Sequence, residues 1–381
     1  MSGTSLDGVD AVLVRWKTQG PRRDVTPEVL AHHYLPYDAP LRDRLRALNA
    51  PGPQELHEAA LAANQVARTY AQAVRSLLNK AQVLPQAVRS IGAHGQTVRH
   101  RPQEFDGTGY TLQLLNGALL AELCGIDVVC DFRTRDLAAG GQGAPLVPAF
   151  HAALFGQNED IAVLNLGGIA NLTIIPARAP DGGLMGEVRG FDCGPGNVLL
   201  DTWCERHTGQ RFDAQGAWAA QGRMRDELLG LALEEPFFAQ PPPKSTGRDL
   251  FNASWLDALL SRCPGASSWW PQDVQATLAE LTAVVVCQDL IGEAPRTARV
   301  LVCGGGAFNT HLMERLSEHL GAAGRCSDVV STSALGVPPD QVEALAFAWL
   351  ARAFAERHAG NLPAVTGAQG PRVLGALYPA G

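Results

Sequence analysis

The chain of 381 residues is longer than one ordinary hydrophobic core supports, so we expect two domains. Hydrophobic residues make up 46% of the sequence and charged residues 18%, a composition typical of a globular protein. The 31 basic and 38 acidic residues give a net charge of −7 without a basic stripe, which argues against a nucleic-acid-binding protein.

Cysteines and hydropathy narrow the class of protein further. The eight cysteines include no Cys-x-x-Cys pair, and several lie in apolar runs, as Cys287 and Cys303 do. This pattern favours buried reduced thiols over disulfides or zinc, since no His/Cys cluster has ligand spacing. No signal peptide is visible, and no apolar run reaches the ~18 residues of a membrane span. We therefore expect a cytoplasmic protein that binds neither a membrane nor nucleic acid.

Elements of two periodicities alternate along the chain, which indicates an α/β architecture. In chain order, the expected strands are residues 9–16, 89–95, 110–115, 126–132, 161–168, 169–175 and 298–303. The expected helices are residues 55–80, 197–207, 224–233, 273–291 and 339–356. The proline-rich stretch 240–244 is predicted to be a loop, because proline cannot donate to a sheet ladder.

Two glycine turns lead into strands: GTSLDG precedes Val9, and NLGG precedes Ile169, 160 residues later. A duplicated fold with one such hairpin in each domain would show this repeat. Two unrelated β-turns explain the same residues about equally well, so the residues alone leave both interpretations open.

The first of these runs, Gly3–Asp10, combines groups that suit a phosphate. Its glycines permit backbone conformations that point several N–H groups at one anion, and its Thr-Ser pair adds hydroxyl donors. Asp7 and Asp10 could hold Mg²⁺ directly or through its waters. A structural turn would explain the glycines equally well, but not the hydroxyls and acids beside them.

A second glycine-rich run, GGGAFN at residues 304–309, follows a strand and opens a helix. Successive glycines let a flat base or a ribose lie against the backbone. The run is not a full G-x-G-x-x-G, because its last position is Asn309, and no suitably placed acidic residue follows. A Rossmann dehydrogenase is therefore disfavoured, and the absence of GxxxxGK[ST] excludes a P-loop enzyme.

Polar residues in three further turns could carry chemistry. Asp192 lies in a Gly/Pro-rich turn before a helix, where a fixed carboxylate could act as a general base or a Mg²⁺ partner. An Asx-turn that only caps the helix explains it as well. His94 in AHGQT has the pattern of a structural histidine, and Arg133, Arg135 and Asp136 that of a surface ion network.

Ten blocks of unusual sequence occur in one order along the chain: MSGTSLDGVD, AHGQTVRHRP, YTLQLLNG, DFRTRDLAAGGQGAPLVPAFH, LNLGGIANLT, GFDCGPGNVLLD, PPPKSTGRDLF, DVQATLAELTA, VCGGGAFN and PPDQVEALAFAWLA. Together they closely resemble the anhydro-N-acetylmuramic acid kinase family, from residue 1 to about residue 378. The resemblance implies the two-domain actin-like α/β fold of sugar kinases and Hsp70 ATPases, with a mixed sheet flanked by helices in each domain and a nucleotide cleft between them. The implied domains are residues 1–145, completed by the helix 339–357, and residues 146–381, which carry the adenosine-binding loop.

The resemblance also implies an activity: water opens the internal bond of 1,6-anhydro-N-acetylmuramic acid, and ATP with Mg²⁺ phosphorylates O6 to give N-acetylmuramic acid 6-phosphate, in cell-wall recycling. It implies a homodimer, and Asp192 as the catalytic base. The implied phosphate-binding residues are Gly3, Thr4, Ser5, Leu6, Asp7, Gly8, Val9, Asp10, Asn165, Gly167 and Gly168, with Asp7 and Asp10 as metal ligands. The implied adenosine-binding residues are Gly304, Gly305, Gly306 and Asn309. The implied sugar-binding residues are His94, Gln96, Arg133, Asp136 and Glu343.

The sequence departs from the family pattern at two places. Cys193 stands where the family commonly has Thr, which leaves a small side chain and a weaker donor. Family members also carry several apolar residues before MSGTS, as the first half of the opening hairpin. We therefore expect the phosphate loop to lack its supporting strand here, either because the start was assigned at an internal Met or because the first sheet has a weakened edge.

Two other functions compete with this one. The first is another actin-fold phosphotransferase or phosphohydrolase acting on a different small molecule. The blocks DFRTRDLAAGGQGAPLVPAFH and PPPKSTGRDLF argue against it, because they are not generic nucleotide motifs. The second is a nucleotide-switched binding module of the Hsp70 type, which would need an appended peptide-binding domain.

Overall fold

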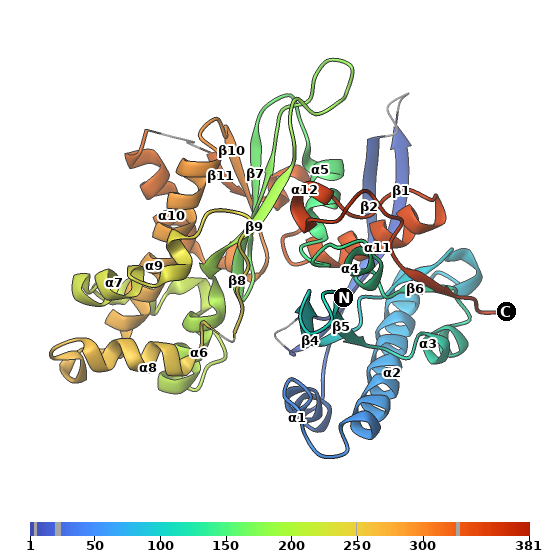
Figure 1. Cartoon of the computed structure of the whole chain (residues 1–381), viewed down its shortest axis with the longest axis horizontal. Helices are drawn as coiled ribbons and strands as arrows, with labels where there is room; N and C mark the ends of the chain where they lie inside the picture. Colours follow the sequence, from blue (N-terminus) through green and yellow to red (C-terminus); the bar gives the residue numbers. More distant parts are fainter. Residues whose placement is uncertain (4–5, 20–23, 249, 325–327) are drawn as a thin grey trace. The chain divides into compact units, whose positions relative to one another are not determined.

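The computed structural model describes all residues except 4–5, 20–23, 249 and 325–327. The chain forms two compact units, one of Met1–Phe155 with Glu343–Gly381 and one of Gly156–Val342 (Figure 1). The α/β class is confirmed, since both units combine helices with mixed or antiparallel sheets.

The first unit contains three small sheets. β1 (Gly8–Gln19) and β2 (Asp24–Pro36) form an antiparallel ribbon, and so do β4 (Gln96–Pro102) and β5 (Gly109–Leu114). β6 (Val128–Cys130) pairs in parallel with β3 (Ile91–Gly92) and antiparallel with β12 (Ala376–Tyr378). The helices of this unit are α1 (Ala39–Ala47), α2 (Glu55–Ala81), α3 (Gly117–Cys124), α4 (Thr134–Ala138), α5 (Val147–Phe155), α11 (Val342–Ala355) and α12 (Pro363–Thr366).

The long helix α2 organises the core of the first unit. Its strong helix formers and its apolar stripe bury Val66 and Tyr70 in one cluster with Val9 and Leu45. It ends at Ala81 and is capped by Gln82, which adopts a left-handed conformation and donates its N–H to carbonyls of the last turn. The pattern-based prediction of a helix over residues 55–80 is therefore confirmed to within one residue.

A cavity of about 580 Å³ lies within the first unit beside β1. β1 residues 9–16 line it, together with β3, α2 residues such as Val74 and Leu77, and α11 residues such as Ala348. Among the described residues, only Met1 bonds this edge of β1. The Met1 amino group donates to Asp10 O (2.7 Å) and Asp10 N donates to Met1 O (2.8 Å), as in a narrow antiparallel pair.

The second unit is built on one five-stranded mixed sheet with the order β11-β10-β7-β8-β9. β7, β8 and β9 are antiparallel neighbours, and β7, β10 and β11 are parallel. Their bounds are β7 Ile161–Leu166, β8 Ile169–Ile175, β9 Arg189–Pro195, β10 Arg299–Cys303 and β11 Asp328–Ser331. The helices are α6 (Asn197–Thr208), α7 (Asp226–Leu233), α8 (Ala253–Arg262), α9 (Pro271–Glu293) and α10 (Thr310–Ala322).

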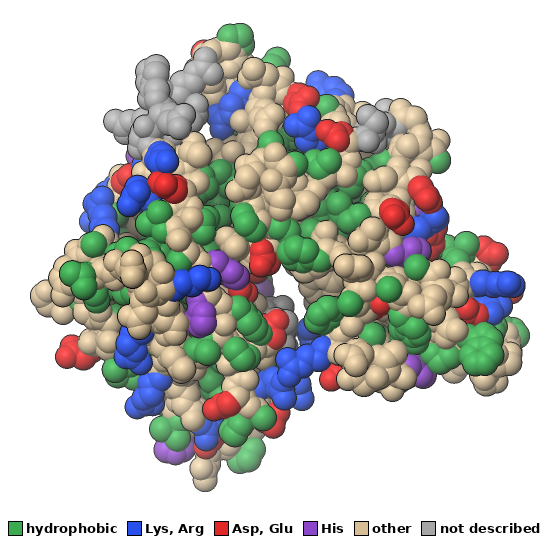
Figure 2. Space-filling model, turned by 180° about the vertical axis from the view of Figure 1, so that it is seen from behind, with side chains coloured by type: hydrophobic (Ala, Val, Ile, Leu, Met, Phe, Trp, Pro, Cys, Tyr) green, Lys and Arg blue, Asp and Glu red, His purple; other side chains and the backbone are tan. Residues whose placement is uncertain are grey.

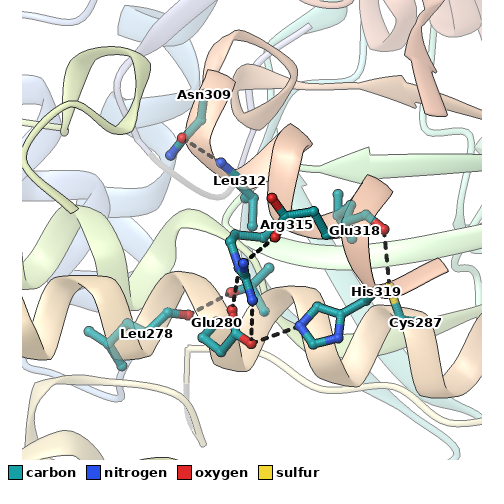
Figure 3. A network of polar contacts seen from close by, with 10 residues as sticks. Leu278, Glu280, Cys287, Asn309, Leu312, Arg315, Glu318 and His319 are labelled. Atoms are coloured by element: carbon teal, nitrogen blue, oxygen red, sulfur yellow. Dashed lines mark hydrogen bonds and ion pairs between the residues drawn. The ribbon is translucent and has the colours of Figure 1, made fainter. Parts of the chain in front are cut away.

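Helix α9 is the core helix of the second unit, and α10 packs along it. Between them, Glu280 of α9 contacts Arg315 (Nε–Oε2 2.7 Å) and His319 (Nε2–Oε1 2.7 Å) of α10 (Figure 3). In the part of the chain that the structure describes, α9 is the one helix long and apolar enough to cross a membrane. Its apolar window has a mean hydropathy of 1.4 and is 78% buried within the protein, as expected of a core helix.

Seven 3₁₀ turns complete the described structure: residues 85–87, 214–216, 219–221, 236–239, 266–268, 305–308 and 332–335. The seven described cysteines are all buried, and no disulfide joins any two of them; Cys326 lies outside the described residues. On the face shown in Figure 2, basic and acidic side chains are interspersed over the surface.

Three features differ from the sequence-based expectations. Asp192 lies inside strand β9, opposite Asn171 of β8, and not in a turn. The expected strands at 89–95 and 126–132 shrink to two and three residues. The tail after residue 357 belongs to the first unit instead of the second, because β12 pairs with β6.

Candidate active site

The N-terminal loop of the first unit is fixed at both ends. Ser2 Oγ donates to the carbonyl of Gly95 and lies 2.8 Å from Tyr70 Oη on α2. At the other end, a side chain on Gly8 would overlap the carbonyl oxygen of Leu35, so glycine is needed for β1 to approach β2 there. Ser2 and Gly8, on either side of the loop, are therefore both anchored on the core.

The predicted phosphate-binding residues of this loop differ in what they can offer. Leu6 and Val9 are buried, so a ligand could use only their backbone groups. Asp7 is exposed. Thr4 and Ser5 lie outside the described residues.

The two predicted metal ligands of the loop are not equivalent. Asp7 is exposed at the start of β1, whereas Asp10 Oδ1 lies 3.2 Å from His32 Nε2 on β2. Among the described residues, no group of three or more His, Cys, Asp or Glu side chains could hold a metal ion. Mg²⁺ that arrives with nucleotide phosphates keeps several waters and needs only one or two protein carboxylates. Asp7 fits that requirement, and Asp10 fits it only if it releases His32.

His94 is buried, and both of its ring nitrogens are used by the protein. Nδ1 lies 3.1 Å from the carbonyl oxygen of Ser2, and Nε2 lies 3.1 Å from Nε and 2.9 Å from Nη2 of Arg133. A carbonyl only accepts and a guanidinium only donates, so Nδ1 carries the proton. Burial, with the charge of Arg133, holds the pKa of His94 well below its usual value, so the ring is neutral. His94 therefore positions Arg133. Both were predicted to contact the sugar, but His94 has no ring nitrogen left for that contact.

Arg133 also donates from Nη1 to the carbonyl of Gly143 (2.7 Å), which leaves other N–H groups of its guanidinium for a ligand. Burial lowers the pKa of Arg133 to about 10, and the carboxylates of Glu343 and Asp136 oppose that shift. Glu343 lies in the first turn of α11, so the structure brings it close enough to Arg133 for the two charges to interact.

Asp136 has no exposed surface and accepts three hydrogen bonds. They come from Gly143 N (2.7 Å), Asn361 Nδ2 (2.6 Å) and Thr366 Oγ1 (2.8 Å). This is not the surface ion network that its sequence context suggested. The carboxylate joins the loop after α4 to the segment around α12, which favours a positioning role over the predicted contact with the sugar.

Gln96 is fully buried, and only one of its two side-chain polar atoms forms a hydrogen bond among the described residues. Its Nε2 donates to the carbonyl of Gly3 (2.9 Å), whereas its Oε1 has no hydrogen-bond partner among the described residues. A buried unpaired acceptor is uncommon and favours a ligand or a water that donates to it. Of the predicted sugar-binding residues, Gln96 is thus the one with an acceptor atom still available.

In the second unit, the carboxyl ends of β7, β9 and β10 lie at the same end of the sheet, where α6 begins. The turn Gly167–Gly168 joins β7 to β8 at this end of the sheet. The first residues of α6 bond to this turn, through Gly196 N to Gly168 O (2.9 Å) and Asn197 N to Gly167 O (2.8 Å). Ligands of open α/β sheets bind beyond the carboxyl ends of parallel strands, which is where these residues lie.

The glycine run after β10 packs against the end of β7. Gly304 has φ +79°, and a Cβ there would lie 2.5 Å from Asn165 Oδ1. A Cβ on Gly306 would lie 2.5 Å from the side chain of Leu166. These two glycines are therefore required by packing. Gly305 has more room, since the nearest atom to its Cβ would be 3.8 Å away.

Asn309 caps α10. Its Oδ1 accepts from Leu312 N (3.0 Å), as Figure 3 shows, and the residue is 9% exposed. A Cβ on Gly216 would meet the same oxygen. The side chain acts as a helix cap in this structure, which gives it a structural use besides the predicted contact with adenosine.

Only one of the two carboxylate oxygens of Asp192 is held by hydrogen bonds from the described residues. Its Oδ2 accepts from Ser245 Oγ (2.9 Å) and Thr246 N (3.0 Å), and its Oδ1 has no hydrogen-bond partner among the described residues. Burial raises the pKa of Asp192, and the two hydrogen bonds partly oppose that shift. A carboxylate with a raised pKa and one free oxygen has the properties of a general base.

Comparison with known proteins identifies the family. The model of the family described as anhydro-N-acetylmuramic acid kinase matches residues 1–380. The chain belongs to this family. It is 56% identical to the anhydro-N-acetylmuramic acid kinase of Albidiferax ferrireducens, over 100% of this chain and 98% of the relative, and 58% identical to that of Bordetella pertussis, over 100% and 95%. Among solved structures, component A of the (R)-2-hydroxyglutaryl-CoA dehydratase of Acidaminococcus fermentans is similar, with 12% identity, a TM-score of 0.43 and coverage of 84% of this chain and 86% of that one.

For this member of the anhydro-N-acetylmuramic acid kinase family, sequence reasoning missed the residues that hold the candidate base. Ser245 and Thr246 bond Asp192 directly, and Lys244 forms a buried ion pair with Asp289 of α9 (3.0 Å). The run PPPKST carried a signal, namely a lysine and two hydroxyls in an otherwise apolar loop. Asp289 gave no such signal in the sequence, because a single acidic residue in a helix usually lies on the solvent-exposed face.

Proposed function

We propose that this protein opens 1,6-anhydro-N-acetylmuramic acid with water and transfers the γ-phosphoryl group of ATP to O6, giving N-acetylmuramic acid 6-phosphate and ADP. Membership of the kinase family supports the reaction as a whole. The observation that carries the chemical step is the carboxylate of Asp192, which is held through Oδ2 and keeps Oδ1 free for a water molecule.

In the proposed step, Asp192 Oδ1 removes a proton from water as the water oxygen attacks the anomeric carbon. The bond from that carbon to O6 breaks, and O6 takes its electron pair to the γ-phosphorus as the bond to the β–γ bridging oxygen breaks. O6 therefore needs no separate deprotonation. The rest of the catalysis is positioning and charge neutralisation, as is general for phosphoryl transfer.

The phosphate-binding role of Gly3–Asp10 and of Asn165, Gly167 and Gly168 is part of the proposal, and so is the adenosine-binding role of Gly304–Gly306. MgATP is the nucleotide substrate, with Asp7 as the carboxylate best placed to meet the metal's waters. For the sugar, Gln96 Oε1 and the remaining N–H groups of Arg133 are the proposed contacts, with Glu343 beside Arg133.

The test is product formation from the anhydro sugar, ATP and Mg²⁺, followed by mass spectrometry. The expected product is heavier than the sugar by one water and one phosphoryl group. Asp192→Asn should abolish it without unfolding the protein, whereas Asp257→Asn, at a partly exposed ion pair with Arg206, should leave activity unchanged. A folded wild-type protein that forms no product would contradict the proposal.

We further propose that the protein acts as a homodimer in the cytoplasm, as its family membership suggests. Light scattering coupled to size-exclusion chromatography tests the dimer, and cell fractionation tests the location. A monomer at micromolar concentration, or recovery in a membrane or secreted fraction, would contradict these two proposals respectively.

A further inference from the structure

A charged pair lies buried behind the candidate base. The ammonium of Lys244 is 3.0 Å from Asp289 Oδ1 on α9, and the Lys244 side chain is 1% exposed. It lies over the ring of Phe237 at 5.3 Å and over that of Phe191 at 6.0 Å. Removing two charges from water costs free energy that their attraction does not always offset, so such a pair is weak evidence for stability. A role in fixing local geometry explains it better.

The pair is linked to Asp192 through three consecutive residues. The carbonyl of Lys244 accepts from Asp192 N (3.0 Å), and Ser245 and Thr246 bond the Asp192 carboxylate. β9 is the edge strand of the sheet, so this segment runs along its free edge. The segment therefore holds both the backbone and the side chain of Asp192.

The two ends of this connection lie on opposite faces of β9. Successive side chains of a regular strand alternate between its faces, so Asp192 faces away from its neighbour Phe191, while its other neighbour, Cys193, lies at the break in register with β8. Those two neighbours are buried with residues of α9, such as Cys287. The side chain of Lys244 lies on their side, against Asp289 of α9, whereas the next two residues hold the carboxylate on the other side.

We propose that Lys244 is a positioning residue for the reaction: its ion pair with Asp289 fixes the segment Lys244–Thr246, which in turn orients the carboxylate of Asp192 toward the attacking water. This inference rests on the proposed function. It assigns to Lys244 and Asp289 an effect that acts only through Asp192, since neither is proposed to touch the substrate.

The proposal predicts a shift in the pH profile as well as a loss of rate. The bonds from Ser245 and Thr246 favour the charged carboxylate, so weakening them raises the pKa of Asp192. The acidic limb of kcat/KM then moves to higher pH. The other titratable groups recorded around this site are Cys193 on β9, Lys244 in the segment and Asp289 on α9. Burial, with Asp289 nearby, holds the pKa of the Cys193 thiol well above its usual value, so it stays protonated across that limb.

The experiment compares Lys244→Met with the matched control Arg189→Met. Arg189 lies on β9 itself and, like Lys244, pairs with α9, through Glu293 (2.6 Å), but among the described residues it has no bond to the Lys244–Thr246 segment. We expect Lys244→Met to lower kcat/KM by about tenfold or more, with KM for ATP unchanged and the acidic limb moved upward. Lys244→Arg should restore part of the loss, and Arg189→Met should leave the limb in place.

A second variant covers the case in which Lys244→Met does not fold. Replacing both partners, as Lys244→Met/Asp289→Leu, removes the buried charges together and avoids leaving one unpaired. A folded double variant with a shifted limb supports the proposal, and one with the wild-type limb overturns it. If the wild type makes no product, or Asp192→Asn stays active, the proposed function fails instead. If wild-type activity depends on Asp192 but the Lys244 variants keep the acidic limb of the wild-type pH profile, this inference is refuted and the proposed function stands.

Discussion

The cavity beside β1 leads to a prediction about the stability of the first unit. Because Met1 already exchanges two hydrogen bonds with Asp10, residues added before Met1 would continue as an antiparallel strand along β1. The cavity is lined by β1 as far as Trp16, so six added residues would lie opposite positions 11–16. Helices α2 and α11 line it as well, so the added strand should be apolar throughout.

The size of the effect follows from the register. Ordering six residues costs about 2 kcal/mol each, and burying six apolar side chains returns about 2 kcal/mol each, so these contributions roughly cancel. The register places hydrogen-bonded pairs opposite Val12, Val14 and Trp16, and two bonds in each pair contribute about 1 kcal/mol per bond. The net stabilisation is about 6 kcal/mol. For a unit of this size, that raises the melting temperature by about 12–24 °C.

The assay is calorimetry of the chain with six apolar β-branched residues added before Met1. The control carries six Gly and Ser residues in the same place, which cannot fill the cavity. We expect a higher transition temperature for the apolar extension alone, because only that extension pairs with β1 and fills the space. Equal stability of the two extended chains would refute the assigned register and the idea that the cavity accepts a strand.

Three further outcomes are expected. Burial alone would raise the pKa of Glu280, but hydrogen bonds from Arg315 and His319 hold it below its usual value. Glu280→Gln should therefore cost about 2 kcal/mol near neutral pH, and the difference from wild type in urea unfolding should be lost as the pH falls through the lowered pKa of Glu280. Gly304→Ala should destabilise by about 1–3 kcal/mol in thermal unfolding, because its positive φ and the nearby end of β7 both oppose a side chain. Gln96→Leu should raise KM for the sugar because it removes the Oε1 acceptor, and KM for ATP should rise as well because it removes the Nε2 bond to the carbonyl of Gly3; an unchanged KM for the sugar in steady-state kinetics would contradict the role given to Oε1.

The elements that local pattern predicted well are those whose partners follow directly in sequence. The helix α2 has its own apolar stripe and strong helix formers, and the β7–β8 hairpin is joined by a Gly-Gly turn. Strand β9 escaped prediction because Gly190, Gly194 and Pro195 have the composition of a turn. It forms because it pairs with β8, across a break in register next to Asn171.

The set of site residues remains a prediction from the sequence, and the hydrogen-bond partners of each side chain could not be predicted from it. Asp136 bonds Asn361 and Thr366, which lie 225 and 230 residues away in the sequence, and no local pattern could indicate such partners. The same limit applies to Lys244, whose partner Asp289 lies 45 residues further along. A motif indicates that a residue belongs to the site, whereas its partners decide what it does there.

The atoms that remain unpaired separate two kinds of residue within the predicted set. His94 and Asp136 have every recorded polar atom engaged by the protein, so substituting them should disturb geometry before it disturbs binding. Gln96 Oε1 and Asp192 Oδ1 keep an acceptor without a partner among the described residues. The buried Oε1 of Gln96 is unfavourable without a donor, and Oδ1 of the half-buried Asp192 is open to one, so these two atoms gain most from a substrate that brings hydroxyl groups and a water molecule. The strongest substrate contacts should therefore be sought at Gln96 and Asp192.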